Sequence, residues 1–271
     1  METDDGHQRQ ITVLLCELLG TALFIYGVIM TGSAAGIPFS LFFSTLIFGA
    51  VTGGHFNPAV SLGVFISEGN YSKNVRLLVL LWIGQFLGGA LAIGLAYLSL
   101  YETRPPPTKV PAELVPRLCP EQYPELAGGK DCDNWHGEGS FIFDWQVLAN
   151  EVLSTFVFVS VILMVKLQEP RVRITSDRIS GTVAIVLSYL AMLRTGIKLG
   201  PCLNPAVAVT LTGNAMLFLD EETHYLTHYV PFYFFGPLLG AALAGLFHTM
   251  HREMLLDEEP AEFREFARDQ K

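Results

Sequence analysis

The tetrapeptide Asn-Pro-Ala-Val occurs twice in the sequence, at residues 57–60 and 204–207. Each copy opens a short apolar stretch, and Asn followed by Pro is a favourable way to begin a helix. The first turn of a helix presents free N–H groups and a partial positive charge of about half an elementary charge. The Asn amide adds further hydrogen-bond donors. Two such helix starts predict a paired site that binds the oxygen of a small polar molecule and repels cations.

Two acidic residues, Glu17 and Glu151, lie deep within long apolar segments. When the two glutamates are superposed, Thr21 matches Thr155 and the flanking leucines and phenylalanines also match. An acid inside a membrane span is a functional candidate by default, and a proton relay is one option. The match also indicates that the second half of the chain repeats the first.

The composition is typical of a polytopic membrane protein. Of the 271 residues, 51% are hydrophobic and only 16% are charged, with a mean hydropathy of +0.40. Soluble domains carry about 25% charged residues, and disordered chains show the opposite balance. The net charge of −9 and the lack of a basic cluster argue against a nucleic-acid partner. The lipid bilayer is the environment that remains.

Six segments are long and apolar enough to cross a bilayer, which takes about 20 residues. These predicted spans are 11–33, 37–55, 76–100, 145–167, 178–197 and 229–251. The stretches 57–67 and 204–214, which begin with the Asn-Pro pairs, cover only about half the membrane at 1.5 Å per residue. Non-helical backbone at that depth is stable only beside protein or a water-filled cavity. We therefore expect two half-helices that begin inside the membrane and form a pore.

The spans and half-helices divide the chain into two channel repeats, 11–100 and 145–251. Each repeat has three spans, an odd number, so the two repeats must lie in the membrane in opposite orientations. Between them lies a long loop, 101–144, predicted to be extracellular or lumenal, and residues 252–271 form a cytoplasmic tail. Lys and Arg concentrate in the segments that place both termini in the cytoplasm. The membrane of residence is left open between the plasma membrane and the endoplasmic reticulum.

Paired Asn-Pro-Ala motifs in six spans, with Glu in spans one and four, resemble the aquaporins, the major intrinsic protein family. The segment Gly-Gly-His-Phe-Asn-Pro-Ala-Val-Ser-Leu-Gly, residues 53–63, is close to the first-motif consensus of that family. The resemblance covers about residues 11–250. It implies an all-α membrane fold with six transmembrane helices and two re-entrant half-helices, one pore in each chain and a homotetramer.

The resemblance also assigns roles to individual residues. The implied pore motif consists of Asn57, Pro58, Ala59, Asn204, Pro205 and Ala206. The implied pore wall consists of His55, Phe56, Gly200, Cys202 and Leu203. Glu17 and Glu151 would each accept hydrogen bonds from the nearby unwound loop, a structural role that we favour over a proton relay. For Cys202, a mercurial-sensitive thiol and a small buried thiol are equally supported.

The sequence departs from the family at the selectivity filter. Aquaporins usually carry Arg directly after the second Asn-Pro-Ala, and here that position is Val207. The other aligned filter positions are Ile37, Met192 and Pro201. Loss of the Arg resembles the unorthodox branch often called superaquaporins, although the first motif is intact here. Arg194 and Lys198 are candidates for a substitute cation.

The expected function is a passive channel for water and small neutral solutes such as glycerol, hydrogen peroxide and ammonia. Ions and protons would be excluded at the paired half-helix tips. No cofactor, metal site or catalytic constellation is expected, so an enzyme is not predicted. Two alternatives are a secondary transporter with inverted repeats and a structural membrane protein whose pore is closed by Met192 or Phe39. A disulfide between Cys119 and Cys132 is a further expectation for the long loop.

Overall fold

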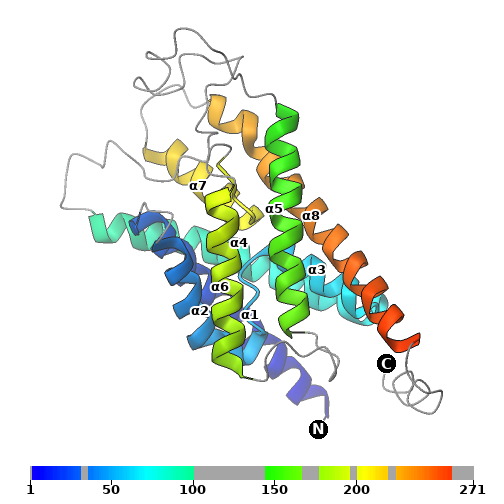
Figure 1. Cartoon of the computed structure of the whole chain (residues 1–271). Coiled ribbons are helices and arrows are strands. Elements are labelled where there is room, and N and C mark those ends of the chain that lie inside the picture. The colour runs from blue at the N-terminus through cyan, green and yellow to red at the C-terminus, as the bar shows by residue number, and fades with distance from the viewer. Residues whose placement is uncertain are drawn as a thin grey trace.

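The computed structural model describes residues 2–31, 36–100, 144–166, 177–195, 200–218 and 224–257, and these residues are helical apart from short connections (Figure 1). The helices in these ranges are α1 (Glu2–Thr31), α2 (Gly36–Thr52), α3 (Pro58–Glu68), α4 (Tyr71–Leu100), α5 (Asp144–Lys166), α6 (Arg178–Thr195), α7 (Pro205–Phe218) and α8 (His224–Asp257). The Cys119–Cys132 pair and Lys198 lie outside the described residues.

Each predicted span corresponds to one helix, but the ends differ. Within the described ranges, α1, α4, α5 and α8 are long and apolar enough to cross a bilayer on length and composition alone. Helices α2 and α6 are shorter, with 17 and 18 residues, which correspond to about 26 Å at 1.5 Å per residue. The predicted span 37–55 stops at Thr52, because Gly53 and Gly54 take φ values of 84° and 64° and end the helix.

The last two helices are longer than predicted. The half-helix expected at 204–214 continues to Phe218. Helix α8 begins before residue 229 and runs to Asp257, so it extends into the segment that was predicted as a cytoplasmic tail. It does so despite Pro231 and Pro237 within it. In α8, apolar residues continue the helical pattern beyond both predicted ends, residues 229 and 251. A hydropathy window of fixed length therefore underestimates the length of this helix.

The distribution of apolar side chains is that of a membrane protein. Large hydrophobic residues cover the outer faces of the helices, and the exposed ones include Phe39, Ile83, Leu153, Leu187 and Phe235. The interior holds fully buried polar side chains, among them Glu17, Gln85 and Glu151. Apolar outer faces and fully buried acidic side chains both differ from the pattern in soluble proteins, where charged residues are seldom buried.

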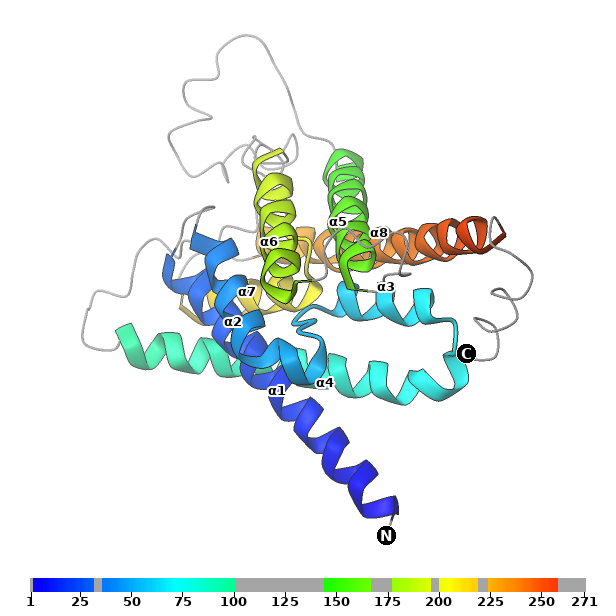
Figure 2. The ribbon, with the colours of Figure 1, turned by 60° about the horizontal axis from the view of Figure 1, so that its bottom comes forward.

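Helix packing repeats between the two halves. Helix α1 packs against α4 and α2, and in the second half α5 packs against α8 and α6. The two half-helices contact the opposite half of the chain: α3 of the first half packs on α8, and α7 of the second half packs on α4. Helices α1 and α5 begin at opposite ends of the bundle in Figure 1. The fold is therefore an inverted repeat, as the sequence predicted. Figure 2 shows α3 lying along α4, which returns in the opposite direction after Gly69.

Equivalent glycines allow the two main helix crossings. A Cβ atom at Gly88 in α4 would collide with the Leu18 carbonyl and lie 2.9 Å from Thr21 Cβ in α1. A Cβ atom at Gly240 in α8 would collide with the Val152 carbonyl in α5 in the same manner. Small residues at such crossings let helix backbones approach closely in a membrane.

The close approach at Gly88 gives a direct test of the packing. We expect Gly88→Ala to destabilise the protein by at least about 1–3 kcal/mol, since the added methyl must displace backbone rather than a flexible side chain. Gly94→Ala on the same helix is the matched control, because a Cβ there meets nothing within 4 Å. The midpoint of thermal unfolding in detergent, measured for each purified variant and for wild type, gives the loss of stability. An equal midpoint for Gly88→Ala and wild type would contradict the packing described here.

Candidate functional site

The two Asn-Pro motifs form the N-terminal ends of α3 and α7. Asn57 caps α3, and its Oδ1 accepts a hydrogen bond from Ala59 N at 2.8 Å. Asn204 does the same for α7, with Oδ1 accepting from Ala206 N at 2.9 Å. Pro58 and Pro205 occupy the first helical positions, where the missing N–H costs nothing. Each Asn side chain therefore fixes the point at which its half-helix begins.

The residue before each Asn has an unusual backbone conformation. Phe56 has φ of 48° and Leu203 has φ of 62°, values that favour glycine. Each such residue costs on the order of 1–3 kcal/mol and persists only where neighbouring contacts determine it. Both side chains are fully buried. The two strained residues lie at equivalent positions of the repeat, immediately before the paired Asn residues.

The Glu17 carboxylate satisfies the backbone of the first loop. Its Oε1 accepts from His55 N at 3.0 Å and its Oε2 accepts from Phe56 N at 2.9 Å. Gln85 Nε2 donates to Glu17 Oε2 at 2.8 Å and to Ser61 Oγ at 2.9 Å. Ser61 Oγ is also 3.1 Å from His55 Nδ1. The carboxylate, the loop and α4 are thus joined in one buried polar network.

Glu151 has the equivalent position in the second loop. Its Oε1 accepts from Cys202 N at 2.6 Å, and its Oε2 accepts from Leu203 N at 3.0 Å. The positions equivalent to Gln85 and Ser61 are Pro237 and Ala208, which have no polar side chain. Of the network around Glu17, the part that recurs around Glu151 is the pair of hydrogen bonds that two backbone N–H groups donate to the carboxylate.

The two loops are joined to each other through the Asn side chains. Asn57 Nδ2 donates to the Leu203 carbonyl at 2.8 Å, and Asn204 Nδ2 donates to the Phe56 carbonyl at 3.0 Å. Sequence reasoning assigned these amides to the pore lumen alone. Because each amide carries two N–H groups, one holds the opposite loop and one is left for another acceptor. The strained peptides of Phe56 and Leu203 are therefore held at both their N–H and C=O groups.

Two polar residues near the first loop were not singled out from the sequence. Gln85 could have been found, because it interrupts an otherwise apolar span. Lys166 ends α5, and its Nζ donates to the carbonyls of Gly53 and Gly54. A Lys at a span end is ordinarily an interfacial anchor, so the sequence carried no signal for this inward contact.

The predicted filter residues belong to the apolar interior. Val207 is buried in the main hydrophobic cluster, and Ile37 and Met192 pack against it partly exposed. Pro201 is also buried. Phe39, one of the two residues that the closed-pore alternative named, does not point into the interior, since it is 61% exposed. Arg194 is exposed at the end of α6.

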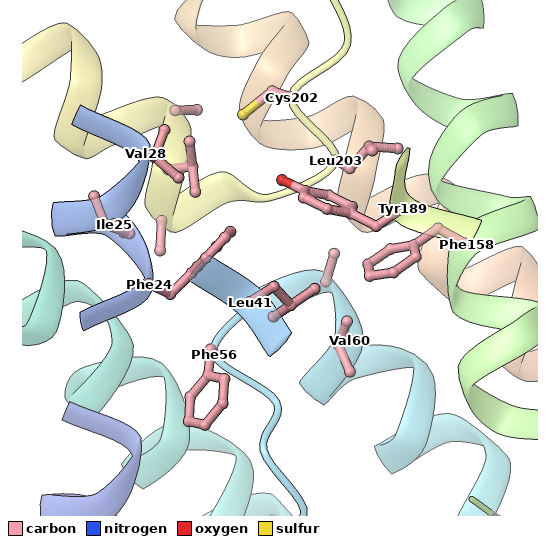
Figure 3. Close-up of a cluster of buried hydrophobic side chains, with 14 of the residues drawn as sticks. Phe24, Ile25, Val28, Leu41, Phe56, Val60, Phe158, Tyr189, Cys202 and Leu203 are labelled. Carbon is pink, nitrogen blue, oxygen red and sulfur yellow. The ribbon is translucent and has the colours of Figure 1, made fainter. Parts of the chain in front are cut away.

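Aromatic side chains lie beside these filter positions. The Tyr189 ring contacts Phe158 at a centroid distance of 5.0 Å and Phe24 at 6.2 Å. Figure 3 shows Tyr189 between the other two rings, with its hydroxyl directed into the cluster. The three residues come from α6, α5 and α1, so they link helices of both halves. Sequence reasoning missed Tyr189, because it lies one helical turn from the aligned filter position Met192.

Cys202 is enclosed by its own loop. The side chain is 2% exposed, and Sγ donates to the Asn204 carbonyl at 3.1 Å. This geometry favours the small buried thiol over the mercurial-sensitive thiol.

Comparison with known proteins identifies a family. The sequence profile of the major intrinsic protein family matches residues 7–248. Aquaporin-8 from Mus musculus is 26% identical, with 93% of this chain and 85% of that protein aligned. The probable aquaporin TIP1-1 from Oryza sativa subsp. japonica is 24% identical, with 90% of this chain and 88% of that protein aligned. The X-ray structure of the aquaglyceroporin from Plasmodium falciparum matches the fold with a TM-score of 0.63 and 17% identity, covering 95% of this chain and 99% of that one.

Glu151 accepts hydrogen bonds from two consecutive backbone N–H groups of the second loop, and we call this arrangement the carboxylate clamp. One isosteric change in Glu151 tests it. In Glu151→Gln, one side-chain oxygen is replaced by an amide NH₂ that faces a backbone N–H instead of accepting from it. We expect a loss of about 1.5–3 kcal/mol of stability, the range for a hydrogen bond to a charged group.

Glu253→Gln on the exposed part of α8 is the matched control and should leave stability unchanged. Thermal unfolding in detergent measures stability, and proton flux in proteoliposomes tests the proton-relay alternative. Unchanged stability together with a changed proton flux would contradict the structural role of Glu151.

Proposed function

Because the chain belongs to the major intrinsic protein family, whose members are membrane channels, we propose that this protein conducts water and small neutral solutes passively between the tips of α3 and α7. The observation that carries the proposal is the reciprocal pairing of the two Asn side chains. Asn57 bonds the carbonyl before Asn204, and Asn204 bonds the carbonyl before Asn57. Two helix N-termini are thereby brought to one place inside the membrane.

The paired tips have the electrostatics that exclude cations. Each helix N-terminus carries about half a positive elementary charge, and the two point toward a common centre in this arrangement. The second N–H of each Asn amide can donate to the oxygen of a water molecule there. A water that accepts from both amides has its hydrogens directed away from the centre. Such a water interrupts a continuous proton wire, while a neutral molecule passes.

Backbone carbonyls would provide acceptors along the rest of the path. The loops Gly53–Phe56 and Gly200–Leu203 are not helical, so their carbonyls are not used within a helix. Backbone carbonyls line the selective part of several kinds of channel. We assign the pore wall to His55, Phe56, Gly200, Cys202 and Leu203 on this ground.

An apolar filter would make the pore permissive toward neutral solutes. Val207 stands where the family usually has Arg, and Ile37, Met192 and Pro201 are also apolar. Without the guanidinium, the filter has neither its donors nor its charge. We therefore propose that glycerol, hydrogen peroxide and ammonia pass with less discrimination against water than in a channel with the Arg.

The wider organisation follows from the same family. We propose that residues 11–100 and 145–251 are the two channel repeats, that 101–144 lie outside or in a lumen, and that both termini are cytoplasmic. Four chains would form a homotetramer, using part of the exposed apolar surface described above. The remaining apolar surface would face lipid.

One observation favours a second candidate, a member of the family whose path is closed. The rings of Phe24 and Tyr189 touch, although they come from α1 and α6 in different halves. If they meet across the path, they narrow it beside the filter. A closed channel would then act as a structural membrane protein.

Osmotic flux in proteoliposomes separates these candidates. Stopped-flow light scattering on purified protein should show water flux well above that of empty liposomes, with a low activation energy, and a measurable glycerol flux. Rates equal to empty liposomes in both gradients would contradict an open channel and favour the closed one.

Restoring the filter Arg tests the proposed permissive filter. We expect Val207→Arg to lower glycerol permeability relative to water by about tenfold, the discrimination that a small pocket gains from one group. Val207→Leu, which stays apolar, should leave the ratio close to that of wild type. Equal glycerol-to-water ratios in Val207→Arg and wild type would contradict the assignment of Val207 to the filter.

A further inference from the structure

A lysine side chain bonds the backbone of the first re-entrant loop. Lys166 is the last residue of α5, and its ammonium donates to the Gly53 carbonyl and, at 3.5 Å, to the Gly54 carbonyl. The next residue of the loop, His55, donates its backbone N–H to the Glu17 carboxylate. Lys166 as a whole is half-buried.

The two carbonyls that Lys166 contacts belong to the non-helical backbone. Gly53 and Gly54 have left-handed φ values, so their carbonyls turn away from the preceding helix. Their N–H groups are already used, by the Gly49 carbonyl and by Thr52 Oγ1 at 2.9 Å. Adjacent carbonyl oxygens attract cations and coordinate them in cation-selective channels. The Lys166 ammonium donates to both of these carbonyl oxygens.

The cation is present in only one half of the repeat. When Glu17 and Glu151 are superposed, the position equivalent to Lys166 is Gly32. The other expected cation, the Arg after the second Asn-Pro-Ala, is Val207. Arg194, considered as a substitute, is exposed at the end of α6. In the part of the chain that the structure describes, a Lys ammonium contacts the first loop, whereas the position after the second Asn-Pro-Ala is apolar.

We infer that Lys166 is a charge-selectivity residue: beside the loop that precedes α3, it excludes small cations from the path and so replaces the missing filter Arg. Its ammonium satisfies the Gly53 and Gly54 carbonyls and adds a fixed positive charge beside them. This inference rests on the proposed channel function.

The test uses two neutral variants and two controls. Lys166→Met removes the charge and both hydrogen bonds, whereas Lys166→Gln removes the charge but keeps an amide donor. Lys166→Arg keeps the charge, and Lys73→Met removes an equal charge from an exposed position in α4. Each variant is reconstituted in liposomes, and two fluxes are measured: osmotic water flux, and the flux of K⁺ followed with a potential-sensitive dye.

We expect Lys166→Met and Lys166→Gln to pass K⁺ at least about tenfold faster than wild type while keeping its water flux, because one fixed charge in a weakly screened site acts strongly on a nearby ion. Lys166→Arg and Lys73→Met should match wild type. Adding Val207→Arg to Lys166→Met should lower the K⁺ flux again, since it returns a cation to the path.

Two results would contradict the inference alone. One is water flux without K⁺ flux in both neutral variants. The other is K⁺ flux in Lys166→Met but not in Lys166→Gln, which would indicate lost hydrogen bonds to the Gly53 and Gly54 carbonyls rather than lost charge. If one neutral variant fails to fold, the K⁺ flux of the other decides. Absence of water flux in the wild type would contradict the channel proposal itself.

Discussion

A buried carboxylate that accepts two consecutive backbone N–H groups is the interaction on which the centre of this protein depends. Without it, each re-entrant loop would leave unsatisfied donors at a depth where water is scarce, at several kcal/mol per group. Glu17 and Glu151 provide the acceptors, and the loop peptides take left-handed conformations to reach them. The carbonyls on the other side of those peptides then face the opposite half and accept from its Asn. The paired helix tips are a consequence of this clamp.

Both halves have the carboxylate clamp, but the side chains that surround it differ between them. In the first half, Gln85 and Ser61 extend it into a polar network that reaches His55, and Lys166 satisfies the preceding carbonyls. In the second half, the positions equivalent to Gln85 and Ser61 are Pro237 and Ala208, and Tyr189 and Cys202 belong to the same hydrophobic cluster. The inverted repeat therefore makes the backbone around each carboxylate similar, while the side chains that contact the two carboxylates differ.

Much of the fold could be predicted from the sequence, because the evidence is local or repeated. The Asn-Pro pairs mark the starts of α3 and α7 at the predicted residues, and the all-α inverted-repeat fold and the family are confirmed. Contacts between distant segments could not be predicted. Nothing local indicates that Asn57 bonds a carbonyl 146 positions away, or that Lys166 turns toward Gly53. The predicted filter positions depend on an alignment, which places residues by register and does not show that Tyr189 lies beside them. The roles of the site residues stay predictions.

Under the proposed function, one N–H of each Asn amide joins the two loops and the other N–H binds the permeating molecule. A structure of the protein in lipid, at a resolution that shows ordered water, tests this most directly. We expect a water within about 2.7–3.2 Å of both Asn57 Nδ2 and Asn204 Nδ2, continuous with further waters toward both sides of the membrane. Protein side chains filling the space between the two amides, with no water reaching either of them, would contradict it.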